Sequence, residues 1–340
     1  MKAKLYCGID LHSNNSMAVL IDDEDRVVYE KRLPNTLEVI LFELSRYRKK
    51  ITGVVVESTF NWYWLVDGLQ EEGYKVHLAN TAAIKQYEGL KYTDDKSDAR
   101  WLAHLLRLGI LSEGYIYPKE ERAVRDLLRK RSQLVRQRVT HILSIQNLMS
   151  RNTGKGLSGA KIKTLTEDEL SSMFESEDVA LAVTCNLRAC KFLTKEILML
   201  EKAVHAKVDL RPEYENLMSV DGIGKILALT IMLEVGDISR FGKAGNFASY
   251  CRCVDSRKIS NEKKKGVNNG KNGNKYLAWS FVEAATFAVR YNAMIRRFYE
   301  KKKAKKNGMV AIKAVAHKLA RACYHVLKDN VSFNIELAFG

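Results

Sequence analysis

The chain has 340 residues, of which 46% are apolar and 28% are charged, so it can bury a sizeable core and is not a disordered tail. Lysine and arginine outnumber aspartate and glutamate by 56 to 40, and this net charge of +16 favours nucleic acid as the partner, because neutralised phosphates release their counterions. The longest apolar run, Ile226 to Val235, is too short to span a bilayer and the N-terminus does not resemble a signal peptide, so we expect no membrane partner and a cytoplasmic, nucleoid-associated location.

The first hundred residues predict a mixed sheet. Three short apolar runs separated by turn-forming residues predict an antiparallel meander: Leu5–Ile9, Met17–Ile21 and Arg26–Leu33. Helix-like and β-branched stretches then alternate: Leu37–Tyr47, Ile51–Val56, Asn61–Glu72, Lys75–Leu78 and a closing helix at Asp98–Leu111. Because strands that alternate with helices pair in parallel, residues 1–115 are predicted to form one α/β domain.

The middle of the chain, residues 116–210, is predicted to be a helical connector. Leu128, Val135, Ile142 and Met149 recur every seven residues, and a second apolar stripe runs from Cys190 to Val208. Both stripes have coiled-coil spacing, which fits either an intramolecular helical hairpin or a dimerisation arm. The Gly-, Ser- and Lys-rich segment between them, 152–163, is predicted to be a turn or a flexible loop.

The last part, residues 211–340, is predicted to be mainly helical. Gly222 and Gly224 precede an apolar helix at 226–235, where backbone N–H groups could approach a phosphate, although a tight turn between helices has the same composition. The segment Arg252–Lys275 carries eight basic residues against two acidic ones and is predicted to be a long polar loop.

Four acidic residues suggest a metal site. Asp10 follows the first predicted strand, Glu57 follows the buried strand 51–56, and Asp95 and Asp98 lie one helical turn apart near a helix start. The C-terminal ends of neighbouring parallel strands converge, so we expect the four carboxylates to gather. Such a set can hold two Mg²⁺ ions, with Mn²⁺ as a possible substitute, for phosphoryl transfer. Without an ion the acids would repel one another and their pKa values would rise.

The segments around these acids resemble a known family. Gly8-Ile9-Asp10-Leu11-His12, Val56-Glu57-Ser58 and Asp95-Lys96-Ser97-Asp98-Ala99 resemble the Asp-Glu-Asp-Asp set of RuvC-like, ribonuclease H-like domains, and in particular the DEDD insertion-sequence transposases of the one-ten family. Later segments resemble the C-terminal domain of that family, in the expected order: 220–224, 234–241, 247–250, 271–277, 282–285 and 310–319.

The resemblance implies a serine nucleophile in the basic loop that links covalently to DNA. The best match is Ser260, although many members have glycine where this chain has Glu262, and Ser256 is a second candidate. The loop residues expected to hold nucleic acid are Arg257, Lys258, Lys263, Lys264, Lys265 and Lys271. From the residues alone, a serine in a basic loop is weak evidence, because a hydroxyl needs a base or a metal to activate it and no histidine lies nearby in sequence.

Three functions remain open at this point. The leading one is a transposase or recombinase that cuts its element's ends and joins them to target DNA. For that function the resemblance further implies a structured noncoding guide RNA and a homo-oligomer, dimer or tetramer. The second is a RuvC-like Holliday-junction endonuclease, which needs the acids but not the serine. The third is a non-catalytic nucleic-acid-binding protein.

Overall fold

A computed structural model describes residues 4–84, 94–207, 211–256, 258–266 and 272–340. The chain divides into two compact units, Met1–Lys119 and Glu120–Gly340, and each is treated by itself. The finer division into domains at residues 115 and 210 stays a prediction.

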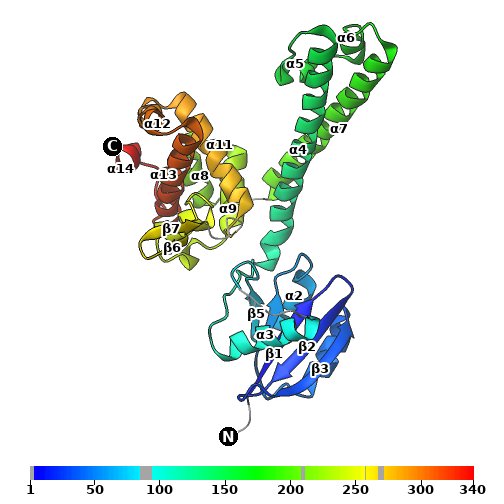
Figure 1. The fold of residues 1–340 in the computed structure, drawn as a ribbon, viewed down its shortest axis with the longest axis vertical. Helices are drawn as coiled ribbons and strands as arrows, with labels where there is room; N and C mark the ends of the chain where they lie inside the picture. Colours follow the sequence, from blue (N-terminus) through cyan, green and yellow to red (C-terminus); the bar gives the residue numbers. More distant parts are fainter. Residues whose placement is uncertain (1–3, 85–93, 208–210, 257, 267–271) are drawn as a thin grey trace. The chain divides into compact units, whose positions relative to one another are not determined.

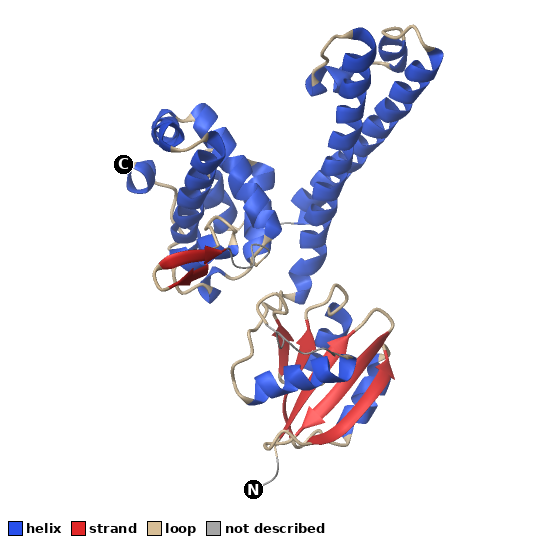
Figure 2. Ribbon diagram, viewed as in Figure 1, coloured by secondary structure: helices blue, strands red, loops and turns tan. Residues whose placement is uncertain are grey.

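The first unit is built on a five-stranded mixed sheet (Figures 1 and 2). Its elements in chain order are β1 (Leu5–Leu11), β2 (Asn15–Ile21), β3 (Val27–Pro34), α1 (Leu37–Ser45), β4 (Ile51–Glu57), α2 (Tyr63–Glu71), β5 (Val76–Ala79) and α3 (Asp95–Arg107). The strand order is β3-β2-β1-β4-β5; β1, β2 and β3 pair antiparallel, whereas β4 pairs parallel with both β1 and β5. The predicted meander and the parallel pairing after it are both confirmed, and the arrangement is compatible with a ribonuclease H-like domain.

Helices cover both faces of this sheet. On one face, Ile40 and Leu44 of α1 and Leu65 and Leu69 of α2 pack on alternate residues of the strands. On the other face α3 lies on the sheet, and its Ala99 and Ala103 contact the remaining alternate residues of β2. The two faces follow from the period of two along each strand, which sends successive side chains to opposite sides.

Helix α3 approaches β1 most closely at Gly8. A Cβ atom at this position would lie 1.9 Å from the carbonyl oxygen of Ala99 and 2.8 Å from the backbone nitrogen of Ala103. Only glycine therefore allows the helix backbone to rest directly on the strand. This contact fixes the position of the N-terminal turn of α3 relative to the C-terminal end of β1.

The second unit begins with a pair of long helices, α4 (Lys119–Thr153) and α7 (Glu177–Lys207), which are capped by α5 (Gly159–Thr164) and α6 (Glu167–Ser171). Ile142 and Ile145 of α4 pack against Val183 and Leu187 of α7. Polar pairs support the same contact: Arg131–Glu201, Arg138–Thr194 and His141–Asn186. The structure therefore contains the intramolecular hairpin, while a dimerisation arm stays a prediction. The predicted turn at 152–163 is wrong in part, because it includes the end of α4 and most of α5.

The remainder of the second unit is mainly helical, as predicted. Its elements are α8 (Pro212–Met218), α9 (Lys225–Val235), a 3₁₀ turn at Ile238–Arg240, α10 (Ala244–Tyr250), β6 (Lys258–Ser260), β7 (Lys263–Gly266), α11 (Lys275–Tyr291), α12 (Ala293–Lys305), α13 (Gly308–Lys328) and α14 (Ile335–Phe339). Helix α9 is buried from Leu227 to Val235 and packs against α8 and α11, which explains its apolar sequence. No helix among the described residues is long and apolar enough to cross a membrane.

The buried carboxylate of Glu234 on α9 joins three parts of the second unit. Arg129 of α4 donates two hydrogen bonds to it, at 2.6 and 2.8 Å, and Asn274 donates a third at 2.7 Å. The side-chain oxygen of Asn274 also caps α11 by accepting hydrogen bonds from the backbone of Tyr276 and Leu277. Glu234 is only 3% exposed, so the loss of any of these donors would leave a buried charge without a full set of partners.

Substitution of Gly8 tests the contact between α3 and β1. Gly8→Ala should lower the free energy of unfolding by about 1–3 kcal/mol, because the new methyl group must push the helix away from the strand. Gly114→Ala is the control, since a Cβ there meets its nearest neighbour at an ordinary 3.5 Å. Urea unfolding followed by circular dichroism measures both variants, and equal midpoints for Gly8→Ala and the wild type would contradict the packing argument.

Candidate metal centre and serine hairpin

Asp10 and Glu57 leave neighbouring strands at the same edge of the sheet. Ile9 pairs with Val56 in the parallel ladder between β1 and β4, so the next residue on each strand is one of the two acids. Both side chains point to the face that α3 covers, because they alternate with Ile9 and Val56, whose side chains lie in the core on the opposite face. Asp10 is only 4% exposed and Glu57 is half-buried.

Asp95 and Asp98 arrive from the first turn of α3. Neither acts as the helix cap, since Asp94 holds that position and its carboxylate accepts hydrogen bonds from the backbone nitrogen and the hydroxyl of Ser97, at 2.8 and 2.6 Å. These bonds hold the pKa of Asp94 below its usual range. The capping that could have explained an aspartate at this helix start is therefore done by a different residue.

Three of the four predicted acids line one cavity. Asp10, Glu57 and Asp98 surround a space of about 140 Å³, whose other lining residues are Thr81, Ile84, Trp101 and Leu102. Burial, and then the neighbouring carboxylates of Asp10 and Asp98, raise the pKa of Glu57 to about 8. The neighbouring carboxylates thus add to the effect of burial on the pKa of Glu57.

The fourth acid, Asp95, joins Asp10 through a histidine. His12 Nε2 lies 3.4 Å from Asp95 Oδ1, and His12 Nδ1 lies 3.5 Å from Asp10 Oδ2. The other carboxylate oxygen of Asp95 accepts a hydrogen bond of 2.5 Å from Arg32 of β3, and this guanidinium holds the pKa of Asp95 below its usual range. One ligand atom from each of Asp10, His12 and Asp95 lies within 4.8 Å of the others.

Sequence reasoning did not assign His12 and Arg32. A signal for His12 was available, because it lies two residues after Asp10 and an extended chain sends residues i and i+2 to the same side. Arg32 carried no such signal, since its contact with Asp95 joins residues 63 positions apart.

The donors fit a divalent cation. Carboxylate oxygens are the ligands that Mg²⁺ and Mn²⁺ prefer, and imidazole nitrogen binds transition metals. His12 Nδ1 is a buried polar atom that makes no hydrogen bond to any residue the structure describes, and its contact with Asp10 is long, at 3.5 Å. A buried nitrogen of this kind, beside the two acids Asp10 and Asp95, suits coordination to a cation.

Ser260 lies in the second unit, on a short β-hairpin. The predicted long polar loop over residues 252–275 is wrong in part, because it contains β6 and β7, which pair antiparallel with Ser260 opposite Lys263. The two residues between the strands, Asn261 and Glu262, both have positive φ, of 50° and 57°, as a tight two-residue hairpin turn requires. Glycine adopts this conformation without strain, which gives a physical reason for the glycine that many members of the resembled family carry at 262.

The two candidate nucleophiles differ in access. Ser260 is exposed beside the turn, whereas the Ser256 hydroxyl oxygen is buried and has no hydrogen-bond partner among the described residues. Lys263 and Lys265 are exposed on β7. Of the other predicted nucleic-acid contacts in this segment, Arg257 and Lys271 lie outside the described residues, and only the backbone is described for Lys258 and Lys264.

The two predicted phosphate-binding glycines have different surroundings. Gly222 has φ +85°, and a Cβ there would lie 2.2 Å from the carbonyl oxygen of Ala284 on α11, so helix packing alone requires a glycine. Gly224 is exposed at the N-cap of α9, and nothing lies within 4 Å of its Cβ position. A phosphate contact at either residue stays a prediction.

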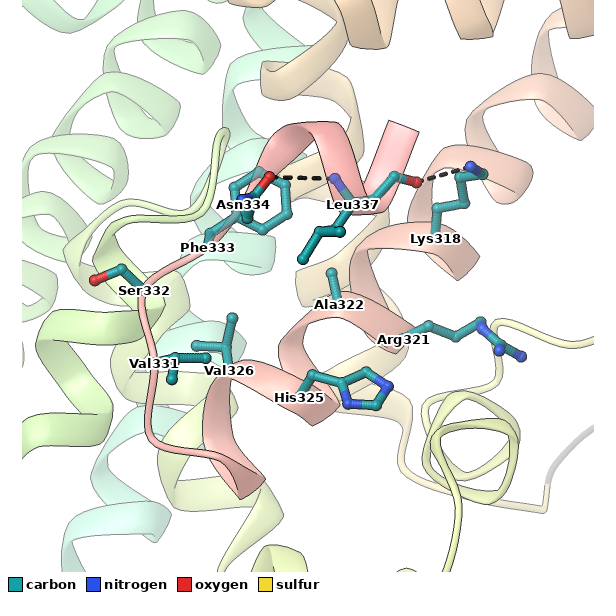
Figure 3. A pocket seen from close by; sticks show the side chains of 11 residues that line it. Lys318, Arg321, Ala322, His325, Val326, Val331, Ser332, Phe333, Asn334 and Leu337 are labelled. Carbon is teal, nitrogen blue, oxygen red and sulfur yellow. Dashed lines mark hydrogen bonds between the residues drawn. The ribbon is translucent and has the colours of Figure 1, made fainter. Parts of the chain in front are cut away.

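A second cavity, of about 490 Å³, lies between α13 and residues 331–338 (Figure 3). Lys318, Arg321 and His325 line it from α13, and Lys318 donates a hydrogen bond to the Ala338 carbonyl oxygen across one end. Among the described residues around this cavity none carries a carboxylate, so it lacks the ligands of a hard cation despite being roomier than the space among the acids.

Two family models match the chain, one from the first unit into α4 and one within the second unit. A DEDD-type model described as transposase matches residues 7–152, and a second, described as the transposase IS116/IS110/IS902 family, matches residues 214–300. Together these matches cover more than half of the chain and include all four acids and both candidate serines.

Individual relatives have low sequence identity to this chain, but the similarity extends over most of its length. The chain is 23% identical to the transposase for insertion sequence element IS1111A of Coxiella burnetii, over 86% of this chain and 79% of the relative. It is 24% identical to a pilin gene-inverting protein of Moraxella bovis, over 98% of both chains. A probable family 20 transposase of Pseudomonas aeruginosa is 25% identical over 67% of this chain and 68% of its own length.

The raised pKa of Glu57 predicts how the stability of the metal-free protein depends on pH. The folded state holds the Glu57 proton up to a pKa of about 8, whereas an unfolded chain releases it near the ordinary glutamate pKa of 4.5. The stability that this proton confers is complete below about pH 4.5 and is lost as the pH rises through about 8. Urea unfolding in EDTA should therefore show a free energy of unfolding that falls from pH 6 to pH 9.

Glu57→Gln should flatten that pH dependence, because the amide does not titrate. Glu38→Gln, at an exposed position on α1, is the matched control and should keep the wild-type slope. An unchanged slope in Glu57→Gln would show that other groups cause the pH dependence.

The hairpin turn predicts a stabilising substitution. Glu262→Gly should stabilise the hairpin against local opening by about 1 kcal/mol, because it removes the cost of a left-handed conformation in a residue with a Cβ. Amide hydrogen exchange across β6 and β7 measures this directly. Asn261→Gly is the control and should gain less, since asparagine tolerates positive φ; equal exchange rates in the wild type and Glu262→Gly would contradict the strain argument.

Proposed function

The chain belongs to the IS116/IS110/IS902 family of insertion-sequence transposases and is an enzyme that cuts and rejoins DNA, and from this premise we propose how its residues divide the reaction. The carboxylates of the first unit bind the divalent cations, two Mg²⁺ ions or Mn²⁺ in their place, and the hairpin of the second unit supplies a serine nucleophile. The observation that carries this proposal is the cavity lined by Asp10, Glu57 and Asp98.

The acids act as ligands and as positioning groups. Bound divalent cations supply charge stabilisation for the attacking and leaving oxygens of the phosphodiester. Asp10 lies at the centre of the set, because it lines the cavity with Glu57 and Asp98 and also neighbours His12 and Asp95. Glu57 must lose its proton to become a ligand, so cation binding releases a proton near neutral pH. Arg32 holds Asp95 at one carboxylate oxygen and leaves the other free for the site.

Ser260 forms the covalent link with DNA in this proposal. Its exposed position beside a tight turn gives a phosphodiester access that Ser256 does not have. The serine oxygen attacks phosphorus, the bridging oxygen of the cleaved strand leaves, and a second attack by a strand end releases the serine, so the number of phosphodiester bonds is conserved. Lys263 and Lys265, which flank the turn on β7, bind the phosphate oxygens together with Arg257, Lys258, Lys264 and Lys271.

The serine needs activation from outside its own hairpin. Acids and serine belong to different compact units, so we propose that they meet on the DNA, with the carboxylate site supplied after domain closure or by another subunit. Exposed apolar side chains along the α4–α7 hairpin support an oligomer, dimer or tetramer, that covers them: Val139, Leu143, Phe192, Leu198 and Met199.

The nucleic-acid partners follow from the same family. The substrates are the double-stranded ends of the element and the target DNA, both in the cytoplasm with the nucleoid. The proposal includes a structured noncoding RNA that selects these sites. The net charge of +16 is compatible with a second polyanion, and the RNA itself is proposed from the family resemblance alone.

Two substitutions separate this mechanism from hydrolysis by water. Ser260→Ala should abolish the covalent protein–DNA adduct and strand joining. Asp10→Asn should lower the rate of cleavage by more than about 1000-fold, because it removes a ligand shared by both parts of the acidic set. Denaturing gels with labelled element ends detect adduct and cleavage separately, and circular dichroism and RNA binding check that each variant is folded.

Ser256→Ala is the matched control and should keep the adduct. Clean cleavage by Ser260→Ala would favour a nuclease of the Holliday-junction type, and full activity of Asp10→Asn would remove the metal site from the proposal.

A further inference from the structure

The acidic residues form two ligand groups of different chemistry that share Asp10. Asp10, Glu57 and Asp98 line the cavity under α3 and offer only oxygen. Asp10, His12 and Asp95 form the second group, which adds an imidazole nitrogen. A carboxylate shared between two ligand groups is the arrangement that lets two cations lie a few ångström apart.

His12 is held in place through its backbone. Its N–H donates to the carbonyl oxygen of Asn15 at 2.9 Å, and its own carbonyl oxygen accepts hydrogen bonds from the amides of Asn35 and Asn61, also at 2.9 Å. These partners come from β2, from the turn after β3 and from the segment after β4. Three such bonds fix the path of the chain at His12 and leave its side chain between Asp10 and Asp95.

The spacing of the second group fits ligands of one ion. Two ligands each about 2.1 Å from an octahedral cation lie about 3 Å apart when adjacent and about 4.2 Å apart when opposite. The 3.5 Å contact with Asp10 involves His12 Nδ1 and the 3.4 Å contact with Asp95 involves His12 Nε2, and an ion takes only one of these nitrogens. One ligand atom from each of Asp10, His12 and Asp95 lies within 4.8 Å of the others, which is close to the separation of opposite ligands. The Arg32 guanidinium holds the second oxygen of Asp95, so this carboxylate is oriented to offer a single oxygen.

We infer that His12 is a direct ligand of one of the two divalent cations, so that the site pairs an all-oxygen ion position with a nitrogen-containing one. This inference rests on the proposed metal site and adds a residue to it. An imidazole ligand increases affinity for first-row transition metals relative to Mg²⁺, because magnesium prefers oxygen and transition metals accept nitrogen. The position beside His12 therefore selects Mn²⁺ over Mg²⁺, whereas the position beside Glu57 and Asp98 discriminates less.

Pulsed electron paramagnetic resonance of the Mn²⁺-loaded full chain tests this assignment without reference to activity. Modulation of the electron spin echo by ¹⁴N should reveal a coordinated imidazole in the wild type and should vanish in His12→Ala. That substitution keeps the three hydrogen bonds at residue 12, since all of them involve its backbone. Titration calorimetry of the same proteins should show Mn²⁺ binding weakened about tenfold or more in His12→Ala, with a smaller change for Mg²⁺.

Two controls isolate the role of His12. His104→Ala removes another histidine that contacts a carboxylate, Asp25 at 2.8 Å, and should leave the ¹⁴N signal intact. Asp98→Asn alters only the all-oxygen group and should also retain it.

Two results would overturn the assignment of His12 as a ligand and leave the proposed carboxylate site standing. In the first, the wild type binds Mn²⁺ but shows no ¹⁴N coupling; in the second, the ¹⁴N coupling persists in His12→Ala. A wild-type protein that binds no Mn²⁺ would overturn both.

Discussion

The direct contact between the backbone of α3 and Gly8 of β1 determines where the functional groups of the first unit lie. Because a Cβ at Gly8 would lie 1.9 Å from the Ala99 carbonyl oxygen, the helix can rest on the strand only at a glycine. Asp10 is two residues further along the same strand, and Asp98 immediately precedes Ala99 on the helix. The contact between α3 and Gly8 is therefore adjacent to the acidic cavity. A substitution that moves α3 away from β1 would also move Asp98 away from Asp10.

The close approach of the carboxylates of Asp10, Glu57 and Asp98 is electrostatically unfavourable by itself. Burial, and then the neighbouring carboxylates of Asp10 and Asp98, raise the pKa of Glu57 to about 8, while Asp95 is stabilised as an anion by Arg32. The site thus contains one carboxyl group that is protonated near neutral pH and one that remains charged. The cations that we propose for this site would relieve the repulsion between the carboxylates.

The second unit presents positive charge beside its candidate serine. The hairpin that carries Ser260 presents Lys263 and Lys265 on its second strand. Further along the chain, Asn274 caps α11 and donates a hydrogen bond to the buried Glu234. Arg129 of α4 completes this buried network, so α4 and the start of α11 are joined through one carboxylate. Ser260, the candidate nucleophile, is exposed on this short hairpin.

The sequence by itself determined the strands and their pairing, the apolar helix α9, the four acids and the family, because each of these leaves a local pattern in period, composition or motif. It did not determine the hairpin at 258–266, since lysines and polar residues give no alternation of apolar side chains there and the turn depends on positive φ at Asn261 and Glu262. Nor did it assign His12 and Arg32 to the site. Their contacts with Asp95 join residues 83 and 63 positions apart in the chain, and only the packing of α3 across the sheet brings them together.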